Sequence, residues 1–340
     1  MLEAKRRKSM YQNMLRIRMI EERIVELYKE QEMRCPTHFS IGQEAIAVGV
    51  CTHLLPKDYV MSAHRSHAHY LAKGGDLKRM LAELYGKKTG CAHGKGGSMH
   101  LIDTSVGFLG CVPIVGSTIP IGVGIAFGAA MQQKDAVTVI FFGDGATETG
   151  IFHESVNYAA IHKLPVLFVC ENNFYSVNTS LECRHPKGRE IVDLAKGHGL
   201  ESYQVEGQEC DKVYHTTASV IEKVRQQQGP VFLEFFTYRW LEHCGPNLDL
   251  QLGFRPAGEY EHWLQRDPIV LYQDLLLKDE ILSSTEIELI RNKIGLEIEE
   301  AVLYAKQSPF PDREELMSSV YPTLEDKTEL REAEACQTVS

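Results

Sequence analysis

The apolar positions of this chain follow two alternating patterns along most of its length. Short segments that predict β-strands lie at residues 59–61, 136–142, 166–171, 202–205 and 231–236. Longer segments with apolar residues at helical spacing predict helices at residues 10–31, 43–54, 75–86, 116–131, 148–162, 190–198 and 211–227, and further helices after residue 279. Strands that alternate with helices favour a parallel sheet with helices on both faces. We therefore expect an α/β fold with a doubly wound, mostly parallel sheet flanked by helices.

The length of the chain, 340 residues, suits one large α/β domain with embellishments. We expect residues 1–320 to form this single domain, and residues 321–340, which are polar and acidic, to form a disordered tail. Residues 87–110 are rich in glycine, lysine and histidine and show little periodicity. Because a long loop inside a compact domain is usually functional, we expect a functional role for this segment.

The charge and the apolar stretches of the chain argue against some classes of binding partner. The net charge of −10, from 36 basic and 46 acidic residues, argues against nucleic acid, because no basic stripe is available to neutralise phosphates. The longest apolar stretch, Ile119 to Met131, is too short to cross a bilayer, and no secretory signal is recognised. Nine cysteines without a CxxC pair do not suggest a disulfide framework. We expect a cytoplasmic protein with neither a nucleic-acid nor a membrane partner.

The candidate chemistry is concentrated where two predicted strands end. Gly143-Asp144-Gly145 follows the first of these strands, and Asn172-Asn173 closes the second. The carboxyl ends of parallel strands meet at one edge of a sheet, so the acid and the amide can face one ligand. Mg²⁺ prefers such oxygen ligands and takes others from phosphate, and the missing side chain of glycine lets a phosphate approach the backbone. The pattern predicts a magnesium-diphosphate site.

This pattern resembles the thiamine diphosphate motif in the α subunits of two-component 2-oxo acid dehydrogenase E1 enzymes, the pyruvate and acetoin dehydrogenase E1 α family. Other stretches that are similar to this family lie at His38 to Ala45, His64 to Gly74, Gly94 to His100, Ile114-Val115-Gly116 and Thr237-Tyr238-Arg239. The resemblance covers roughly residues 10–320 in unbroken order. It implies the thiamin diphosphate-binding fold, with thiamine diphosphate and Mg²⁺ as cofactors.

The resemblance also implies which residues hold the metal and the diphosphate. Asp144 and Asn173 would ligate Mg²⁺ by their side chains, and Tyr175 would do so through its backbone carbonyl. Gly145 and Ala146 would contact the diphosphate through their backbone. The alternative for Asp144 is an ordinary cap of the helix that follows it.

Further cofactor contacts follow from the same resemblance. Arg65 lies where the family has its diphosphate clamp, and His64 takes the neighbouring cofactor-contacting position, which is often Tyr in relatives. Ile114 and Val115 lie where the family wedges the cofactor into a bent form, and Arg239 belongs to a further cofactor-binding segment.

Two histidines are candidates for catalysis. His243 aligns with the active-site histidine of the family, and His38 aligns with a second histidine of the substrate pocket. In isolation, His243 would be an ordinary loop histidine. Pyruvate-type relatives carry His-Gly-His-Ser where this chain has Leu241-Glu242-His243-Cys244, so Glu242 adds a negative charge beside the site. Because Cys244 replaces the serine that some mitochondrial members phosphorylate, phosphorylation at that position is unsupported. The segment from His64 resembles acetoin-type chains more than pyruvate-type ones.

The reaction that follows from the resemblance is cleavage and oxidation of a 2-oxo acid or acetoin, with the acyl group passed to a lipoyl arm. The alternatives are a carboligase or transketolase-like half-subunit, which transfers the carbanion to an aldehyde, and a non-catalytic member that only assembles with a partner. Thiamine chemistry needs a carboxylate at the aminopyrimidine, and in the family this glutamate lies on a second domain that this chain lacks. We therefore expect a β-type E1 subunit in an α2β2 assembly, together with a lipoyl-bearing E2 partner.

One helix of the predicted domain is a candidate subunit contact. Gly124 and Gly128 lie four residues apart in the segment 116–131, and glycines at that spacing let another helix approach closely. Close packing of this face onto the domain's own sheet is the alternative.

Overall fold

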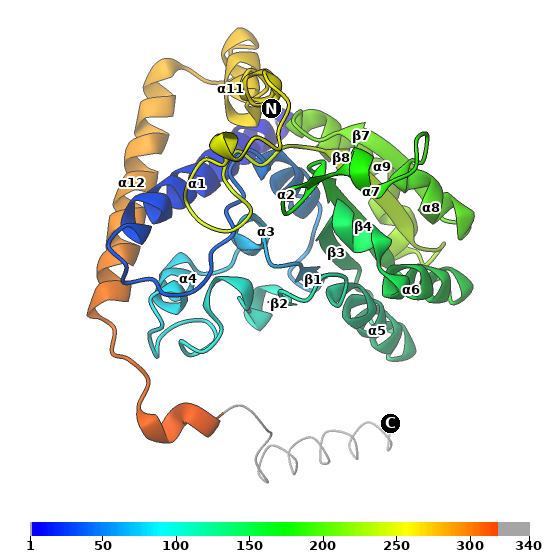
Figure 1. Ribbon diagram of the computed structural model, residues 1–340, viewed down its shortest axis with the longest axis horizontal. Helices are drawn as coiled ribbons and strands as arrows, with labels where there is room; N and C mark the ends of the chain where they lie inside the picture. Colours follow the sequence, from blue (N-terminus) through cyan, green and yellow to red (C-terminus); the bar gives the residue numbers. More distant parts are fainter. Residues whose placement is uncertain (1, 319–340) are drawn as a thin grey trace.

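The computed structural model describes residues 2–318, and the tail expected at residues 321–340 lies outside this range. Within it, a six-stranded parallel sheet has the order β2-β1-β3-β4-β8-β7 and carries helices on both faces (Figure 1). The strands are β1 (Tyr59–Ser62), β2 (Phe108–Cys111), β3 (Thr138–Gly143), β4 (Val166–Asn172), β7 (Glu201–Glu206) and β8 (Val231–Phe236), and a separate hairpin consists of β5 (Tyr175–Ser176) and β6 (Thr179–Ser180). The expected α/β class and doubly wound parallel sheet are confirmed.

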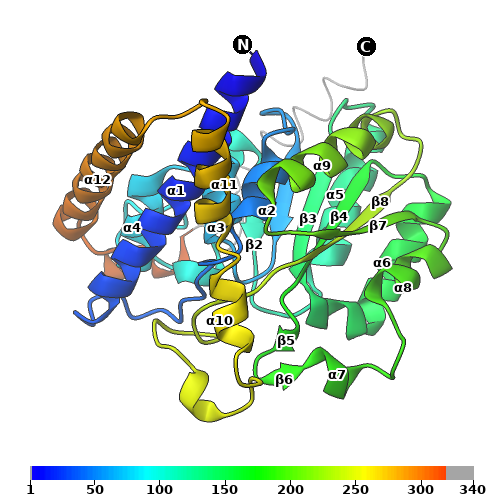
Figure 2. The ribbon, with the colours of Figure 1, turned by 90° about the horizontal axis from the view of Figure 1, so that it is seen from above.

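Helices cover both faces of the sheet, and their bounds agree with the sequence pattern except where noted below. They are α1 (Leu2–Tyr28), α2 (Glu44–Cys51), α3 (His67–Ala72), α4 (Leu77–Leu84), α5 (Thr118–Met131), α6 (Gly150–Ile161), α7 (Leu181–Arg184), α8 (Ile191–Gly197), α9 (Cys210–Arg225), α10 (Glu259–Leu264), α11 (Pro268–Lys278) and α12 (Ser284–Gln307). Figure 2 shows α1, α11 and α12 along one side of the molecule and α6 and α8 on the other. No helix among residues 2–318 is long and apolar enough to span a membrane.

Two hydrophobic cores explain why the central strands are apolar throughout. Successive side chains of a strand point to opposite faces, so Val139 and Phe141 of β3 pack into the core beneath α1, α2 and α9. Ile140 and Phe142 pack into the second core, beneath α5, α6 and α8. Because both faces of β3 and β4 are covered, an uninterrupted apolar run, and not an alternating one, is the pattern of a central strand here.

The structure differs from the sequence predictions at short or polar elements. Strand β2 begins inside the segment 87–110 that we expected to be a loop and ends at Cys111. It was missed because its four residues include a glycine and give no recognisable period. Helices α3, α7, α10 and α11 and the hairpin β5–β6 were also missed. Helix α1 begins at Leu2 and not at Met10, because its first turns are charged and carry no apolar period.

The surroundings of helix α5 distinguish between the two explanations for its glycines, which are contact with another subunit and close packing onto the domain's own sheet. A Cβ at Gly122 would lie 2.5 Å from the Ile140 side chain, so this glycine packs onto the domain's own sheet. A Cβ at Gly124 or at Gly128 would meet nothing within 4 Å. The alternative that Gly124 and Gly128 pack onto the sheet is therefore wrong, and their face of α5 is open.

The glycine-rich part of the segment 87–110 is organised by one buried carboxylate. Glu83 is 1% exposed and accepts hydrogen bonds from the backbone N–H groups of Ala92, Gly94, Gly96 and Gly97, at 2.7–3.0 Å. Several of these residues must be glycine, since a Cβ at Gly94, where φ is +75°, would lie 2.7 Å from the backbone of Gly86. The loop therefore wraps around a fixed negative charge.

We predict that Glu83→Gln destabilises the chain by about 1–3 kcal/mol, because an amide nitrogen would face backbone donors that then lose their acceptor. Urea unfolding of the variant measures this, and Glu288→Gln, an exposed change on α12, is the matched control. Equal stability of the two variants would show that the carboxylate does not organise the loop.

Candidate active site

A cavity lies at the carboxyl ends of β1, β3 and β4, where the sequence predicted a ligand site. Most of the predicted site residues line it: His64, Arg65, Val115, Asp144, Gly145, Ala146, Asn173, Tyr175 and His243. Three others, His38, Ile114 and Arg239, are not among its lining residues. The register explains this convergence, because Gly143 at the end of β3 pairs with Glu171 near the end of β4.

Asp144 lies directly after β3 and is 1% exposed. Helix α6 begins after Thr149, and no side chain caps it, so the alternative that Asp144 caps this helix is wrong. Burial raises the pKa of Asp144, and the guanidinium of Arg184, which forms an ion pair with the carboxylate, acts in the opposite direction. Sequence reasoning missed Arg184, because nothing in the local sequence pattern sets it apart from the other arginines of the chain.

The side chains of Asn172, the last residue of β4, and of Asn173, which follows it, point to different places. The Asn172 side chain donates a hydrogen bond to the Glu234 carboxylate at 2.8 Å and so links the neighbouring strands β4 and β8. Asn173 donates to Gln43 at 3.0 Å, and its carbonyl oxygen accepts from the Tyr175 N–H at 3.3 Å, which turns the chain at the rim of the cavity. Only Asn173 therefore offers an amide oxygen on the cavity side.

The donor set suits a hard cation bound to a phosphate. The Asp144 carboxylate, the Asn173 amide oxygen and the backbone at Tyr175 are all oxygen donors, which Mg²⁺ prefers. At Gly145 a Cβ would lie 2.8 Å from the Ser176 hydroxyl oxygen, so only glycine keeps this turn open to a ligand. The residues present therefore fit a magnesium-diphosphate group.

Arg65 joins the two loops that carry the candidate catalytic histidines. Its guanidinium donates to the carbonyl oxygen of Phe39 at 2.6 Å and to that of His243 at 3.1 Å. Burial and the neighbouring charge of Arg239 lower the pKa of Arg65 to about 10, which leaves it charged at neutral pH. Two of its donors are thus engaged with backbone, although the side chain lines the cavity.

Three histidines form a cluster at one end of the cavity. The ring centroids of His38 and His64 lie 4.4 Å apart, those of His38 and His243 4.9 Å, and those of His64 and His243 5.3 Å. Burial, assisted by the charge of Arg65, lowers the pKa to about 2 for His38, about 4 for His64 and about 3 for His243. All three imidazoles are therefore neutral at physiological pH.

The same cluster brings three ring nitrogens within 4.8 Å of one another, which invites comparison with a metal site. A divalent cation there would lie beside the charged guanidinium of Arg65, and the repulsion between these charges opposes binding. The positive field suits an anionic or carbonyl oxygen better than a metal.

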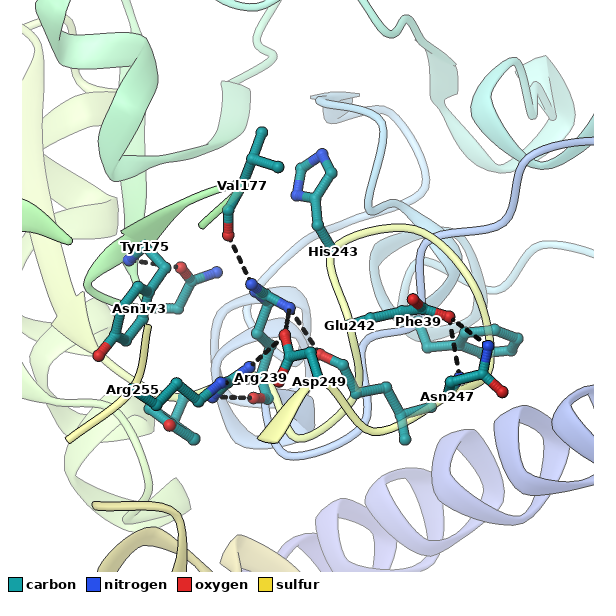
Figure 3. A network of polar contacts seen from close by, with 12 residues as sticks. Phe39, Asn173, Tyr175, Val177, Arg239, Glu242, His243, Asn247, Asp249 and Arg255 are labelled. Atoms are coloured by element: carbon teal, nitrogen blue, oxygen red, sulfur yellow. Dashed lines mark hydrogen bonds and ion pairs between the residues drawn. The ribbon is translucent and has the colours of Figure 1, made fainter. Parts of the chain in front are cut away.

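Arg239 lies behind the cavity and holds two loops together (Figure 3). Its guanidinium donates to the carbonyl oxygens of Val177 and Leu241, both at 2.6 Å, and pairs with Asp249 at 3.0 Å. Arg255 pairs with the same carboxylate at 2.8 Å. The structure thus gives Arg239 a supporting position and no place in the cavity lining. Asp249 and Arg255 were missed by sequence reasoning.

The loop that carries His243 is braced from within. The Glu242 carboxylate accepts from the backbone and side-chain nitrogens of Asn247, at 3.0 and 2.9 Å, so this charge is partly satisfied inside its own loop. Cys244 is exposed.

The two apolar residues expected to wedge a cofactor are unusually open. Ile114 is 71% exposed and Val115 is 51% exposed, on the loop that precedes α5. Only Val115 lines the cavity.

A fourth histidine, His69, lines the cavity together with a carboxylate and was not predicted. His69 stacks on Phe141 at 4.0 Å between ring centroids and lies 3.1 Å from the Glu171 carboxylate. His69 and Glu171 both line the cavity. No motif pointed to them, since the contact joins α3 to β4 across the sheet.

We predict that acidification destabilises this chain through the histidine cluster. The folded pKa of His64 is below its unfolded value of 6.5, so the unfolded chain binds more protons as pH falls, and stability present above about pH 6.5 is lost towards pH 4. When the pH falls from 7.5 to 5.5, the free energy of unfolding of the unmodified chain should decrease. In His64→Gln this decrease should be smaller by up to about 1 kcal/mol, which urea unfolding at the two pH values measures. The exposed His215→Gln is the control, and equal losses in all three proteins would contradict the neutral cluster.

Comparison with known proteins agrees with this geometry. The profile of the family described as "Dehydrogenase E1 component" matches residues 12–314. The α subunit of acetoin:2,6-dichlorophenolindophenol oxidoreductase from Bacillus subtilis is 39% identical over 93% of both chains. Pyruvate dehydrogenase E1 component subunits α are 36% identical in Porphyra purpurea, over 90% of both chains, and 34% in Rickettsia felis, over 92% of this chain and 94% of the relative. The chain therefore belongs to the dehydrogenase E1 component family.

Proposed function

We propose that this chain is the α subunit of a two-component E1 enzyme that cleaves and oxidises a 2-oxo acid or acetoin and passes the acyl group to a lipoyl acceptor. One observation carries the proposal: a single cavity combines the oxygen donors Asp144 and Asn173 with the neutral imidazoles of His64 and His243. The names of the relatives support it, since they describe α subunits of acetoin and pyruvate enzymes. In this proposal, residues 1–320 act as one cofactor-binding unit.

The cofactors of the proposal are thiamine diphosphate and Mg²⁺. Asp144, Asn173 and the Tyr175 carbonyl would hold the metal, and the backbone at Gly145 and Ala146 would hold the diphosphate. Thiamine diphosphate, when bound, supplies a carbon nucleophile that attacks a carbonyl group of the substrate.

The chain's own side chains position the substrate. His243 and His64 line the cavity as neutral imidazoles, so each can donate a hydrogen bond to a substrate oxygen or accept one from a hydroxyl group. His38 is 6% exposed, and its Nδ1 has no hydrogen-bond partner within residues 2–318, so this nitrogen is available to a ligand that enters the cluster. Arg65 adds the fixed positive charge that favours an oxygen with developing negative charge.

A β-type partner completes the proposal. The open face of α5, with Ile121 at 46% and Met131 at 71% exposure, is apolar and continues from the exposed Ile114 and Val115 beside the cavity. A contiguous apolar surface next to a cofactor cavity is typical of a subunit contact. An α2β2 assembly with a lipoyl-bearing E2 partner is the arrangement we propose.

To test the reaction, the chain assembled with its β partner should be given pyruvate, branched 2-oxo acids or acetoin as donor, and lipoamide or an aldehyde as acceptor. We expect acyl-lipoamide from one donor class. A ligated ketol with no reduction of lipoamide would support the carboligase alternative instead.

The matched variant for this assay is Asp144→Ala. It should weaken Mg²⁺-dependent binding of thiamine diphosphate by at least the roughly 100-fold that loss of an outer-shell partner can cost. Asp193→Ala, which removes an exposed carboxylate of α8, should leave cofactor binding unchanged. Tight cofactor binding by Asp144→Ala, measured calorimetrically, would contradict the assigned site.

The partner surface is tested by Gly124→Leu. A Cβ at this position meets nothing in the chain, so the variant should fold normally but assemble at least about tenfold more weakly with the β partner. Gly295→Leu is the matched control, because Gly295 lies in α12 and is equally open. Sedimentation analysis of the mixed subunits measures assembly, and normal assembly of Gly124→Leu would exclude this face of α5 as the contact.

A further inference from the structure

An arginine outside the cavity holds the carboxylate that the proposed function assigns to the metal. Arg184, at the end of α7, places one guanidinium nitrogen on Asp144 and the other on Glu148. Its Nε donates to the carbonyl oxygen of Thr179 at 3.2 Å, which fixes the direction of the side chain. The Arg184 side chain is 9% exposed and that of Asp144 is 2% exposed, so the pair is shielded from water.

Arg184 belongs to a small flap, which we define as residues 175–184, comprising β5, β6 and α7. Tyr175, Ser176 and Val177 of this flap line the cavity, whereas Arg184 does not. Figure 2 shows the flap lying together with α10 on one side of the molecule. Arg184 therefore ties one wall of the cavity to the turn that follows β3.

The charges in this arrangement explain why the contact matters. A buried carboxylate without a compensating charge is strongly destabilising, and Arg184 provides that compensation for Asp144. A metal ion at the same carboxylate would be a second cation close to the guanidinium, so the two would repel one another. Glu148, whose side chain is 29% exposed, offers Arg184 a second anionic partner about one helical turn further on.

We propose that Arg184 is a positioning residue that neutralises Asp144 before metal binding, latches the flap against the turn after β3, and competes with Mg²⁺ for the Asp144 carboxylate. Binding of Mg²⁺ then requires Arg184 to break its ion pair with Asp144, while its ion pair with Glu148 remains. This inference rests on the proposed function, since it presumes that Asp144 binds Mg²⁺ with thiamine diphosphate.

The experiment is a calorimetric titration of the chain assembled with its β partner, with Mg²⁺ added at a fixed concentration of thiamine diphosphate. Arg184→Gln should reach half-saturation at a Mg²⁺ concentration about tenfold lower than the unmodified protein, because the competing charge is gone. Arg184→Lys keeps the charge and should restore a requirement close to that of the unmodified protein. Arg189→Gln removes the same charge just beyond the flap, where no ion pair is present among the described residues, and should change nothing.

A second readout follows the flap itself. Without Mg²⁺, Arg184→Gln should be cleaved faster than the unmodified protein within residues 177–189 during limited proteolysis, and Mg²⁺ with thiamine diphosphate should remove most of this difference. If the unmodified assembly binds no cofactor, the proposed function fails. If it binds cofactor but Arg184→Gln needs the same Mg²⁺ concentration or a higher one, only the role of Arg184 as a competitor is overturned.

Discussion

The parallel pairing of β3 with β4 is the constraint on which the rest of the site depends. Gly143 pairs with Glu171 at the ends of these strands, so the residues that follow, Asp144 and Asn173, emerge side by side. A shift of one residue would turn the alternating side chains to the opposite faces. Both hydrophobic cores would then lose their partners, since Val139 and Ile140 belong to different cores. Packing of the sheet therefore fixes the geometry of the site.

Buried charges determine how the loops close around that edge. Three arginines near the cavity are each held by an acceptor from a segment far away in sequence: Arg65 by Phe39 and His243, Arg239 by Val177, and Arg184 by Asp144. A buried charge tolerates few alternative arrangements, because removing one partner leaves the other uncompensated. The loops are thus ordered by electrostatics where they have no regular secondary structure. Burial, together with the charge of Arg65, keeps the imidazoles of His38, His64 and His243 neutral.

One side of the cavity is not covered by the part of the chain that the structure describes. The cavity is walled by the chain on the side of the flap and of the His243 loop, while Val115 and the α5 face beside it remain exposed. This exposed apolar side is the surface that the proposed β-type partner would cover.

The fold class and the main candidate residues could be predicted from the amino-acid sequence alone. Apolar runs at 136–142 and 166–171 are typical of strands buried on both faces, and the Gly-Asp-Gly turn and Asn173 lie at their ends. These features are local, so spacing along the chain carries them. Strand β2 and the hairpin β5–β6 were not predicted, because strands of two to four residues are too short to show a period of apolar residues.

The contacts between side chains of distant segments could not be predicted from the sequence, because they are set by tertiary packing. It put Arg184 on Asp144, Asp249 on Arg239 and His69 beside Glu171, and it separated the packed Gly122 from the open Gly124. The His69–Glu171 contact joins residues 102 positions apart, and the Arg239–Val177 contact joins residues 62 apart. Such pairings depend on how helices and loops pack onto the sheet, and a local pattern of polar and apolar residues contains no information about that packing.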